Sequence, residues 1–236
     1  MTSQQILSEL KAAGNEATKK IFLKHGAKEP LYGVSIENLK KIQKKIKEDR
    51  QSIALQLFSS GIGDAMYLAA LVADGSKMSK KELDDWASGA GWPMISEYSV
   101  AWVASENDAG WELALKWIDS PKENIASSGW STLSSIVATR PDEKLDIPGL
   151  KKLLTRVANE IEKASNRVRL CMNAFVIAVG SYVAQLNKEA IAIGKKIGSV
   201  EVNMHGSNCK VPFAPDYIKK VMDKGNLGKK RKTAKC

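Results

Sequence analysis

Apolar residues recur every three or four positions along most of this chain, in short segments separated by glycine, proline and serine. In the segment 36–46, Ile36, Leu39, Ile42 and Ile46 follow this spacing, and lysines fill many of the other positions. The spacing places the apolar side chains on one face of a helix. No alternating pattern of useful length indicates strands. We therefore expect an all-α protein.

The same spacing predicts further helices along the whole chain, with an irregular segment at 198–211. Their expected ranges are 2–12, 16–25, 50–59, 63–73, 79–88, 94–104, 108–118, 122–138, 147–163, 166–185, 187–197 and 214–224. Short helices joined by tight turns pack most simply as stacked antiparallel pairs. We expect residues 1–223 to form a HEAT-like helical-repeat solenoid, an α-α superhelix with a degenerate repeat of roughly 40 residues.

The chain is strongly basic, with 36 Lys and Arg against 26 Asp and Glu, a formal net charge of +10. This balance favours polyanionic partners, with nucleic acid first, although excess lysine also serves solubility alone. No acidic residue follows Asp223, so we expect residues 224–236 to be a flexible basic tail that binds phosphate. The expected DNA-binding residues are Lys40, Lys41, Lys44, Lys45, Arg167, Arg169, Lys229, Lys230, Arg231 and Lys232.

Several classes of chemistry lack their usual sequence marks. There is no Gly-x-Ser-x-Gly elbow, no Walker-type loop and no Gly-x-Gly-x-x-Gly run, so we expect neither acyl transfer nor a nucleotide cofactor. His205 and Cys209 are four residues apart, but no convincing set of further ligands accompanies them, so we expect no metal. The three cysteines are too few and too far apart for a disulfide framework, and no segment is apolar enough to span a membrane. We expect a cytoplasmic monomer.

Six tryptophans lie between positions 86 and 130, and most are expected in the core. Trp92 differs because it lies in a Gly-Trp-Pro turn that leads into a helix with Ser96 and Glu97. A turn presents an indole to a ligand more readily than a helix interior does, so packing and function remain equally open for Trp92. Phe175 lies on an apolar helix behind Arg167 and Arg169, which is either a buried helix with a basic edge or a phosphate-binding element.

Two segments carry a resemblance to a known family. Residues 31–46 read LYGVSIENLKKIQKKI, and residues 64–74 read DAMYLAALVAD. Both resemble segments of the AlkD-like DNA alkylation repair proteins, a family of HEAT-like alkylpurine DNA glycosylases and their relatives. With residues 83–102, the resemblance extends to about residue 185.

The resemblance implies a concave, basic solenoid that holds double-stranded DNA by its phosphate backbone, with an aromatic pair and an aspartate at the lesion. Trp92 matches the tryptophan of the family's Trp-x-x-x-Asp segment, and Phe175 lies where a second tryptophan is expected. Ser96 occupies the aspartate position. A carboxylate there would stabilise an oxocarbenium-like state, which a serine hydroxyl does poorly. Glu97 is adjacent, but it points about 100° away unless the helical register shifts.

A family arginine that contacts phosphate also has no counterpart in residues 125–130, where serines stand instead. The leading hypothesis is a DNA-binding member of the DNA alkylation repair superfamily, and a glycosylase for cationic alkylpurines if it is active. A non-enzymatic nucleic-acid-binding member and a protein-interaction scaffold are the alternatives. If the leading hypothesis holds, a positively charged hollow should have Trp92, Phe175 and the Lys40 to Lys47 cluster on one wall.

Overall fold

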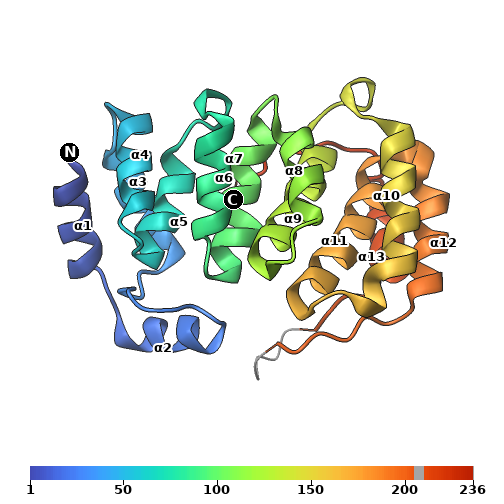
Figure 1. Cartoon of the computed structure of the whole chain (residues 1–236), viewed down its shortest axis with the longest axis horizontal. Helices are drawn as coiled ribbons and strands as arrows, with labels where there is room; N and C mark the ends of the chain where they lie inside the picture. Colours follow the sequence, from blue (N-terminus) through green and yellow to red (C-terminus); the bar gives the residue numbers. More distant parts are fainter. Residues whose placement is uncertain (205–209, 236) are drawn as a thin grey trace.

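The computed structural model describes residues 1–204 and 210–235, and within these ranges every regular element is a helix (Figure 1). The expected all-α, HEAT-like solenoid is confirmed. The α-helices are α1 Ser3–Ala12, α2 Glu16–Lys24, α3 Ile36–Lys45, α4 Arg50–Ser59, α5 Gly63–Val72, α6 Lys80–Gly89, α7 Ala101–Glu106, α8 Gly110–Ile118, α9 Glu123–Thr139, α10 Ile147–Glu160, α11 Asn166–Tyr182, α12 Asn187–Ile197 and α13 Ala214–Asp223. Shorter helical segments are η1 Gly75–Lys77, η2 Ile95–Val100, η3 Asp142–Lys144, η4 Ile161–Lys163 and η5 Ala184–Leu186.

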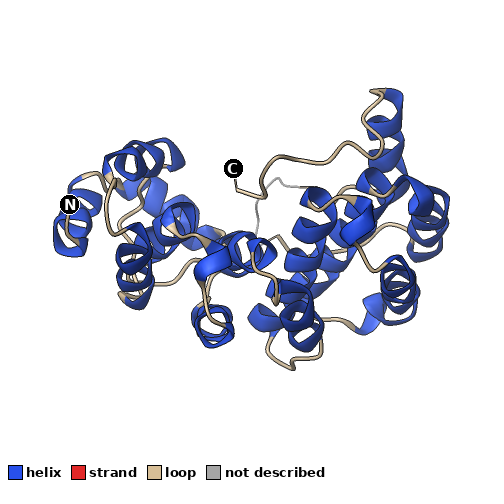
Figure 2. Ribbon diagram, turned by 90° about the horizontal axis from the view of Figure 1, so that it is seen from above, coloured by secondary structure: helices blue, strands red, loops and turns tan. Residues whose placement is uncertain are grey.

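The helices stack in two layers that follow an arc (Figure 2). One layer runs through α3, α5, η2 with α7, α9, α11 and α13, each of which contacts the next. Helices α4, α8 and α12 each pack against a helix of this layer, and α10 packs against α11 and α12. Every α-helix except α2, which has no buried residue, thus packs against two or more neighbouring elements, which is the way a solenoid builds a continuous core.

Local signals explain several helix boundaries. The Ser35 side chain caps α3 by accepting from the Asn38 N–H, and Ser79 and Glu82 form a full capping box at α6. The expected helix 94–104 instead begins as the π-helix η2 before it continues as α7. The described parts of the expected irregular segment, 198–204 and 210–211, contain no helix.

The two segments that resemble the alkylation repair family meet in space. The buried Asp64 carboxylate, at the start of α5, accepts hydrogen bonds from the backbone N–H groups of Tyr32 (2.5 Å), Gly33 (3.3 Å) and Val34 (2.7 Å). Gly33 has a φ of +77°, and a Cβ there would lie 2.5 Å from the Asn15 backbone. One carboxylate therefore fixes the turn before the basic helix α3, and this turn sets the orientation of the helix.

Replacing Asp64 by Asn should lower the free energy of unfolding by about 2–4 kcal/mol. The amide would lose the charge that strengthens three hydrogen bonds and would turn one donor toward backbone N–H groups in a buried site. Urea denaturation measures the change. Asp85→Asn, at an exposed position paired only with Lys81, is the matched control and should change stability by less than about 0.5 kcal/mol. Equal stability of both variants would contradict the structural role of Asp64.

The buried apolar residues form two clusters. The first extends from Ile6 to Trp117 and includes Trp92, and the second extends from Ala114 to Ile218 and includes Phe175. Ala234, almost at the C-terminus, belongs to the first cluster although it follows the last helix of the second. The C-terminal segment therefore connects the two halves of the molecule.

The expectation of a free, flexible basic arm is wrong. Residues 224–235, which we call the C-terminal strap, run back along the open side of the arc and end between the two halves (Figure 2). The Gly228 N–H donates to Ser181 O and the Arg231 N–H to Ala138 O. Lys230 binds Val137 O and Asp142, while Lys235 binds Ala73 O and Glu106. The strap is ordered because its amines and amides satisfy carbonyls at helix C-termini.

Lys235→Met should therefore destabilise the protein by about 1–2 kcal/mol. The substitution keeps most of the apolar stem but removes a charged donor from the end of α5. Thermal or urea unfolding would show the loss, and Lys232→Met, at an exposed position of the same strap, should leave stability unchanged within about 0.5 kcal/mol. An unchanged midpoint for Lys235→Met would mean that the strap contributes nothing to the fold.

Across the residues that the structure describes, no single helix has the length and apolar content needed to cross a bilayer. Helix α11 passes that test only together with the following Ala184–Ile197 segment, and the two are bent by 116° where they join.

Candidate nucleic-acid interface

The Gly-Trp-Pro turn places Trp92 in the first apolar cluster. Its side chain is 5% exposed, and its ring centroid lies 5.1 Å from that of Phe22. The indole also packs close to Gly63, where a Cβ would lie at ordinary contact distance, 3.6 Å from Trp92 Cε3. The Trp92 Nε1 atom is buried and has no hydrogen-bond partner among the described residues. Trp92 therefore packs as a core residue, while its polar nitrogen remains unused within the described chain.

Ser96 and Glu97 follow in the π-helix η2, which has i to i+5 hydrogen bonds and so departs from the α-helical register. The Ser96 hydroxyl donates only weakly, to Trp92 O at 3.4 Å and Pro93 O at 3.5 Å. π-Helical turns often occur at functional sites. The helical register therefore changes in this segment, but Ser96, and not Glu97, lines the cavity beside Trp92.

The Glu97 carboxylate, however, is bound by Arg167 of α11. Arg167 Nε donates to Glu97 Oε1 at 2.7 Å, and Arg167 Nη2 donates to Glu97 Oε2 at 2.6 Å. The Glu97 side chain is 6% exposed and that of Arg167 16%. This bidentate pair neutralises the charge of both residues. The expectation that Arg167 is a free phosphate ligand is wrong in this arrangement, because its guanidinium is already engaged.

The electrostatics of the pair follow from burial. Burial raises the pKa of Glu97, the charge and hydrogen bonds of Arg167 oppose that rise, and nearby Glu123 adds to it. For Arg167, burial lowers the pKa, but the hydrogen bonds and the charge of Glu97 together raise it by more. The pKa of Arg167 therefore lies above its ordinary value. Burial also raises the pKa of the adjacent Cys171 thiol. Cys171 thus stays a protonated thiol and not a reactive thiolate.

Glu123 was not predicted from the sequence, yet it completes the site. Its Oε1 accepts from the Arg167 backbone N–H at 2.9 Å and places a negative charge at the N-terminus of α11. A cavity of about 70 Å³ lies between Trp92, Ser96, Glu123 and Arg167. Ligand pockets commonly measure about 300–1,000 Å³, so this cavity is small for a bound ligand. Glu123 follows Pro121 and Lys122, where an acidic residue is common in the first turn of a helix. The sequence alone therefore did not indicate its role at this site.

Phe175 does not lie beside Trp92. It is fully buried in the second cluster, and its ring packs under Trp130 with the centroids 5.3 Å apart. The expectation that Phe175 faces a DNA base, on one wall with Trp92, is therefore wrong. Phe175 is buried because α9 packs against α11 and covers this position.

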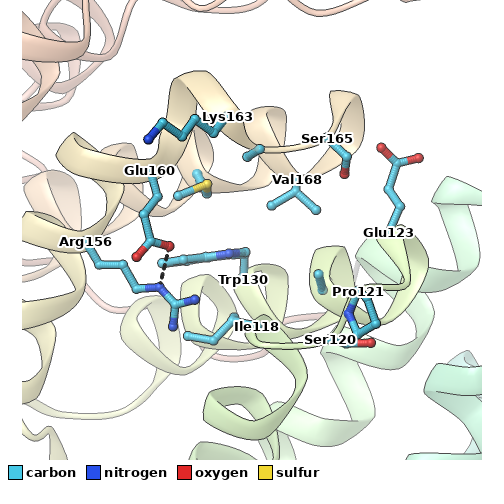
Figure 3. Close-up of a pocket in the computed structure, with 13 residues that line it drawn as sticks. Ile118, Ser120, Pro121, Glu123, Trp130, Arg156, Glu160, Lys163, Ser165 and Val168 are labelled. Atoms are coloured by element: carbon cyan, nitrogen blue, oxygen red, sulfur yellow. Dashed lines mark hydrogen bonds and ion pairs between the residues drawn. The ribbon is translucent and has the colours of Figure 1, made fainter.

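Trp130, in contrast, lines a cavity of about 320 Å³ (Figure 3). The Arg156 guanidinium lies 6.0 Å from the Trp130 ring centroid and pairs with Glu160 (2.8 Å) and Asp119 (2.7 Å). Lys163 and Glu123 lie at the edges of the same pocket (Figure 3). The Arg156 guanidinium at this pocket is thus neutralised by its two acidic partners.

The basic residues expected to bind phosphate fall into two groups. In α3, Lys41 pairs with Glu37 and Lys45 with Glu9, whereas Lys40 and Lys44 have no acidic partner among the described residues. In the C-terminal strap, Lys230 is engaged, while Lys229, Arg231 and Lys232 are exposed. Arg169 is half-buried, and its Nε has no partner within the described ranges.

Metal binding has no support in the described part of the chain, where no group of three or more His, Cys, Asp or Glu residues gathers. His205 and Cys209 lie outside the described residues. Of the described cysteines, Cys171 is a buried free thiol near Ser131, whose hydroxyl lies 3.4 Å from its sulfur.

The model of the family described as DNA alkylation repair enzyme matches residues 6–214. The chain belongs to this DNA alkylation repair family. An uncharacterised protein of Listeria innocua is 32% identical over 231 residues, which cover 96% of this chain and 100% of that protein. An uncharacterised protein of Listeria monocytogenes is 31% identical, with 95% of this chain and 99% of that protein covered.

A solved structure extends the comparison within the family. It is described as a new family of proteins related to the HEAT-like repeat DNA glycosylases with affinity for branched DNA structures. It is 36% identical to this chain, covers 100% of both chains, and superposes with a TM-score of 0.91. The AlkD-like resemblance drawn from the residues is thereby confirmed, and this chain is a full-length match to a relative of the glycosylases.

Removing one partner of the buried ion pair should be costly. Arg167→Met should lower the free energy of unfolding by about 3–5 kcal/mol, because Glu97 would be left buried and unpaired. The double variant Glu97→Gln/Arg167→Met should recover at least half of that loss. Urea unfolding of both single variants and the double variant measures the coupling. Losses that simply add would show that the two side chains act independently.

Proposed function

We propose that this protein binds branched DNA through the phosphate backbone and does not hydrolyse the N-glycosidic bond. The observation that carries the second part is the Glu97–Arg167 pair. Ser96 replaces the carboxylate that such hydrolysis needs, and the neighbouring acid is neutralised by two hydrogen bonds from a guanidinium. Phe175 is buried, so the aromatic pair that would hold a cationic base is absent as well. The affinity for branched DNA of the 36% identical relative supports the first part.

The charge distribution agrees with backbone binding. Lys40 and Lys44 are unpaired within the described residues, and Lys229, Arg231 and Lys232 lie exposed on the strap along the open side of the arc (Figure 2). Lysines and arginines of this kind hold phosphates and fix orientation without reading bases. A formal charge of +10 adds long-range attraction to any DNA. The protein acts as a cytoplasmic monomer in this proposal.

Affinity for a branched duplex should fall steeply with salt, as counterion release requires. In Lys40→Gln/Lys44→Gln, the slope of log K against log salt should become shallower by about 1–2, because up to two phosphate contacts are lost. Fluorescence anisotropy at several salt concentrations measures this. The control Lys152→Gln/Lys196→Gln removes equal charge from exposed positions on α10 and α12 and should change the slope less. Equal slopes for both pairs would place the DNA elsewhere.

Incubation with alkylated duplex DNA should release no base above the uncatalysed background, since Ser96 carries no charge, Glu97 is bound by the Arg167 guanidinium and Glu123 is bound by the Arg167 backbone N–H. Chromatography of released bases checks this, with an active glycosylase as the positive control. Base release that disappears in Glu97→Gln but survives in Ser96→Ala would show instead that the π-helical turn supplies a displaced acid. Absence of any DNA binding, with capture of one stoichiometric protein partner, would favour an interaction scaffold.

A further inference from the structure

A larger pocket lies farther along the same helices that carry the candidate site. It measures about 360 Å³ and lies between the C-terminal halves of α9 and α11, next to α13 and the C-terminal strap. We call it the Tyr217 pocket. Its walls include Ser134, Ser135, Ser181, Tyr182, Tyr217 and Arg231. Its volume falls within the range of about 300–1,000 Å³ that small-molecule sites commonly occupy.

The pocket shares a helix face with the candidate site. Ser127 and Ser131 of α9 are followed four residues later by Ser135, and residues four apart lie above one another on a helix. On α11, Arg167 is seven residues before Ala174, which also lines the pocket. At 1.5 Å per residue, this separation is about 10 Å. A DNA molecule that lies along this face of α9 and α11 would therefore extend over the Tyr217 pocket.

Two aromatic side chains stand at the pocket. Tyr217 of α13 is 47% exposed, which is unusual for so large an apolar ring, and Tyr182 at the end of α11 is half-buried. Aromatic faces that remain accessible offer stacking surfaces, and every nucleobase has a flat face that can stack on one. Tyr182 also packs against the second apolar cluster, whereas the Tyr217 ring remains largely open to solvent.

A buried polar atom without a partner also lines this pocket. Ser181 is 2% exposed, and its Oγ finds no hydrogen-bond partner among the residues that the structure describes. Leaving a buried hydroxyl unsatisfied is destabilising, so such groups usually have a hydrogen-bond partner. A base edge, with its donors and acceptors, would satisfy this hydroxyl.

The strap supplies positive charge to the pocket. The Arg231 backbone N–H donates to Ala138 O, and the Gly228 N–H donates to Ser181 O, so the strap is anchored to the ends of α9 and α11. The exposed Arg231 side chain forms no ion pair within the described residues. Helix C-termini carry partial negative charge, which disfavours an anion deep in the pocket. The arrangement suits an uncharged ring inside and a phosphate outside, near Arg231.

We propose that the Tyr217 pocket binds one unpaired nucleotide at a DNA branch point, with its base between the two tyrosines and its phosphate at Arg231. This inference deepens the proposed function and rests on it, because a branch with a single-stranded arm offers an unpaired base and a fully paired duplex does not. Base stacking contributes affinity with little sequence preference, so the pocket reads DNA structure and not sequence. Specificity for branches over plain duplex follows from it.

The test compares two branched DNA molecules that differ in one respect. Both have a single-stranded arm, but in the second the arm nucleotides nearest the junction are replaced by abasic residues that keep the phosphates. The full chain should bind the first roughly tenfold more tightly in anisotropy titrations, the fold-change expected for stacking one base. Tyr217→Ala should abolish this preference, and Tyr217→Phe should keep it, because phenylalanine retains the ring.

Arg231→Gln should weaken binding of both DNA molecules, whereas Lys232→Gln, at the next position and outside the pocket, should weaken them less. A 2-aminopurine at the first arm position should lose fluorescence on binding to the wild type and not on binding to Tyr217→Ala. Equal affinity of the wild type for both branched molecules would overturn this inference and leave the proposed function standing. Failure to bind either molecule would overturn both.

Discussion

The ion pair between Glu97 and Arg167 connects two halves that otherwise have separate apolar clusters. Glu97 belongs to a π-helix that packs with the first cluster, and Arg167 begins a helix of the second. Both side chains are largely buried, so the pair tolerates little change in the relative position of the halves. The curvature of the arc at its middle, and with it the surface offered to DNA, therefore depends on this contact.

The same contact sets the chemistry of the centre. A free carboxylate there would be negative and able to stabilise a cationic transition state, but a bidentate guanidinium cancels that charge. Glu123 then occupies the N-terminus of α11, where an anion would otherwise bind. The centre of a basic protein is thus close to electrically neutral, and the unpaired positive charge lies around it, on α3 and the C-terminal strap. With this charge distribution, a polyanion would be bound by the basic residues around the centre and not by the centre itself.

Helical spacing alone was enough to predict the layout of the fold, because each short helix must bury one apolar face and carries its own capping or turn signals. The expected segments 36–46, 63–73 and 187–197 differ from α3, α5 and α12 by at most one residue at an end. The π-helix η2 was not predicted, since residues 95–100 contain no glycine, proline or other residue that distinguishes a π-helical from an α-helical hydrogen-bond pattern. The strap was misjudged for a different reason. Its lysines bind carbonyls at helix ends, and composition does not distinguish such lysines from solvated ones.

Site residues were harder to predict than helices because their roles depend on contacts across long stretches of chain. Trp92, Ser96 and Glu97 were singled out as one local group, yet the partner of Glu97 is 70 residues away. Phe175 matched a family position by spacing, but the packing of α9 over α11 buries it beneath Trp130. Asp64 and the turn at Tyr32 were recognised as separate motifs, and only the structure shows that one binds the other.

In an ordinary helical array each repeat senses only its neighbours, and the ends fray independently. Here Lys235 reaches Ala73 across 162 positions of sequence, so the last residues of the chain cover an early turn. This long-range contact links the C-terminal end of the helical array to its N-terminal half, so the two halves stabilise each other. Loosening of α13 would uncover the end of α5, and melting should accordingly proceed as a single cooperative event that a linear stack of the same helices would not show.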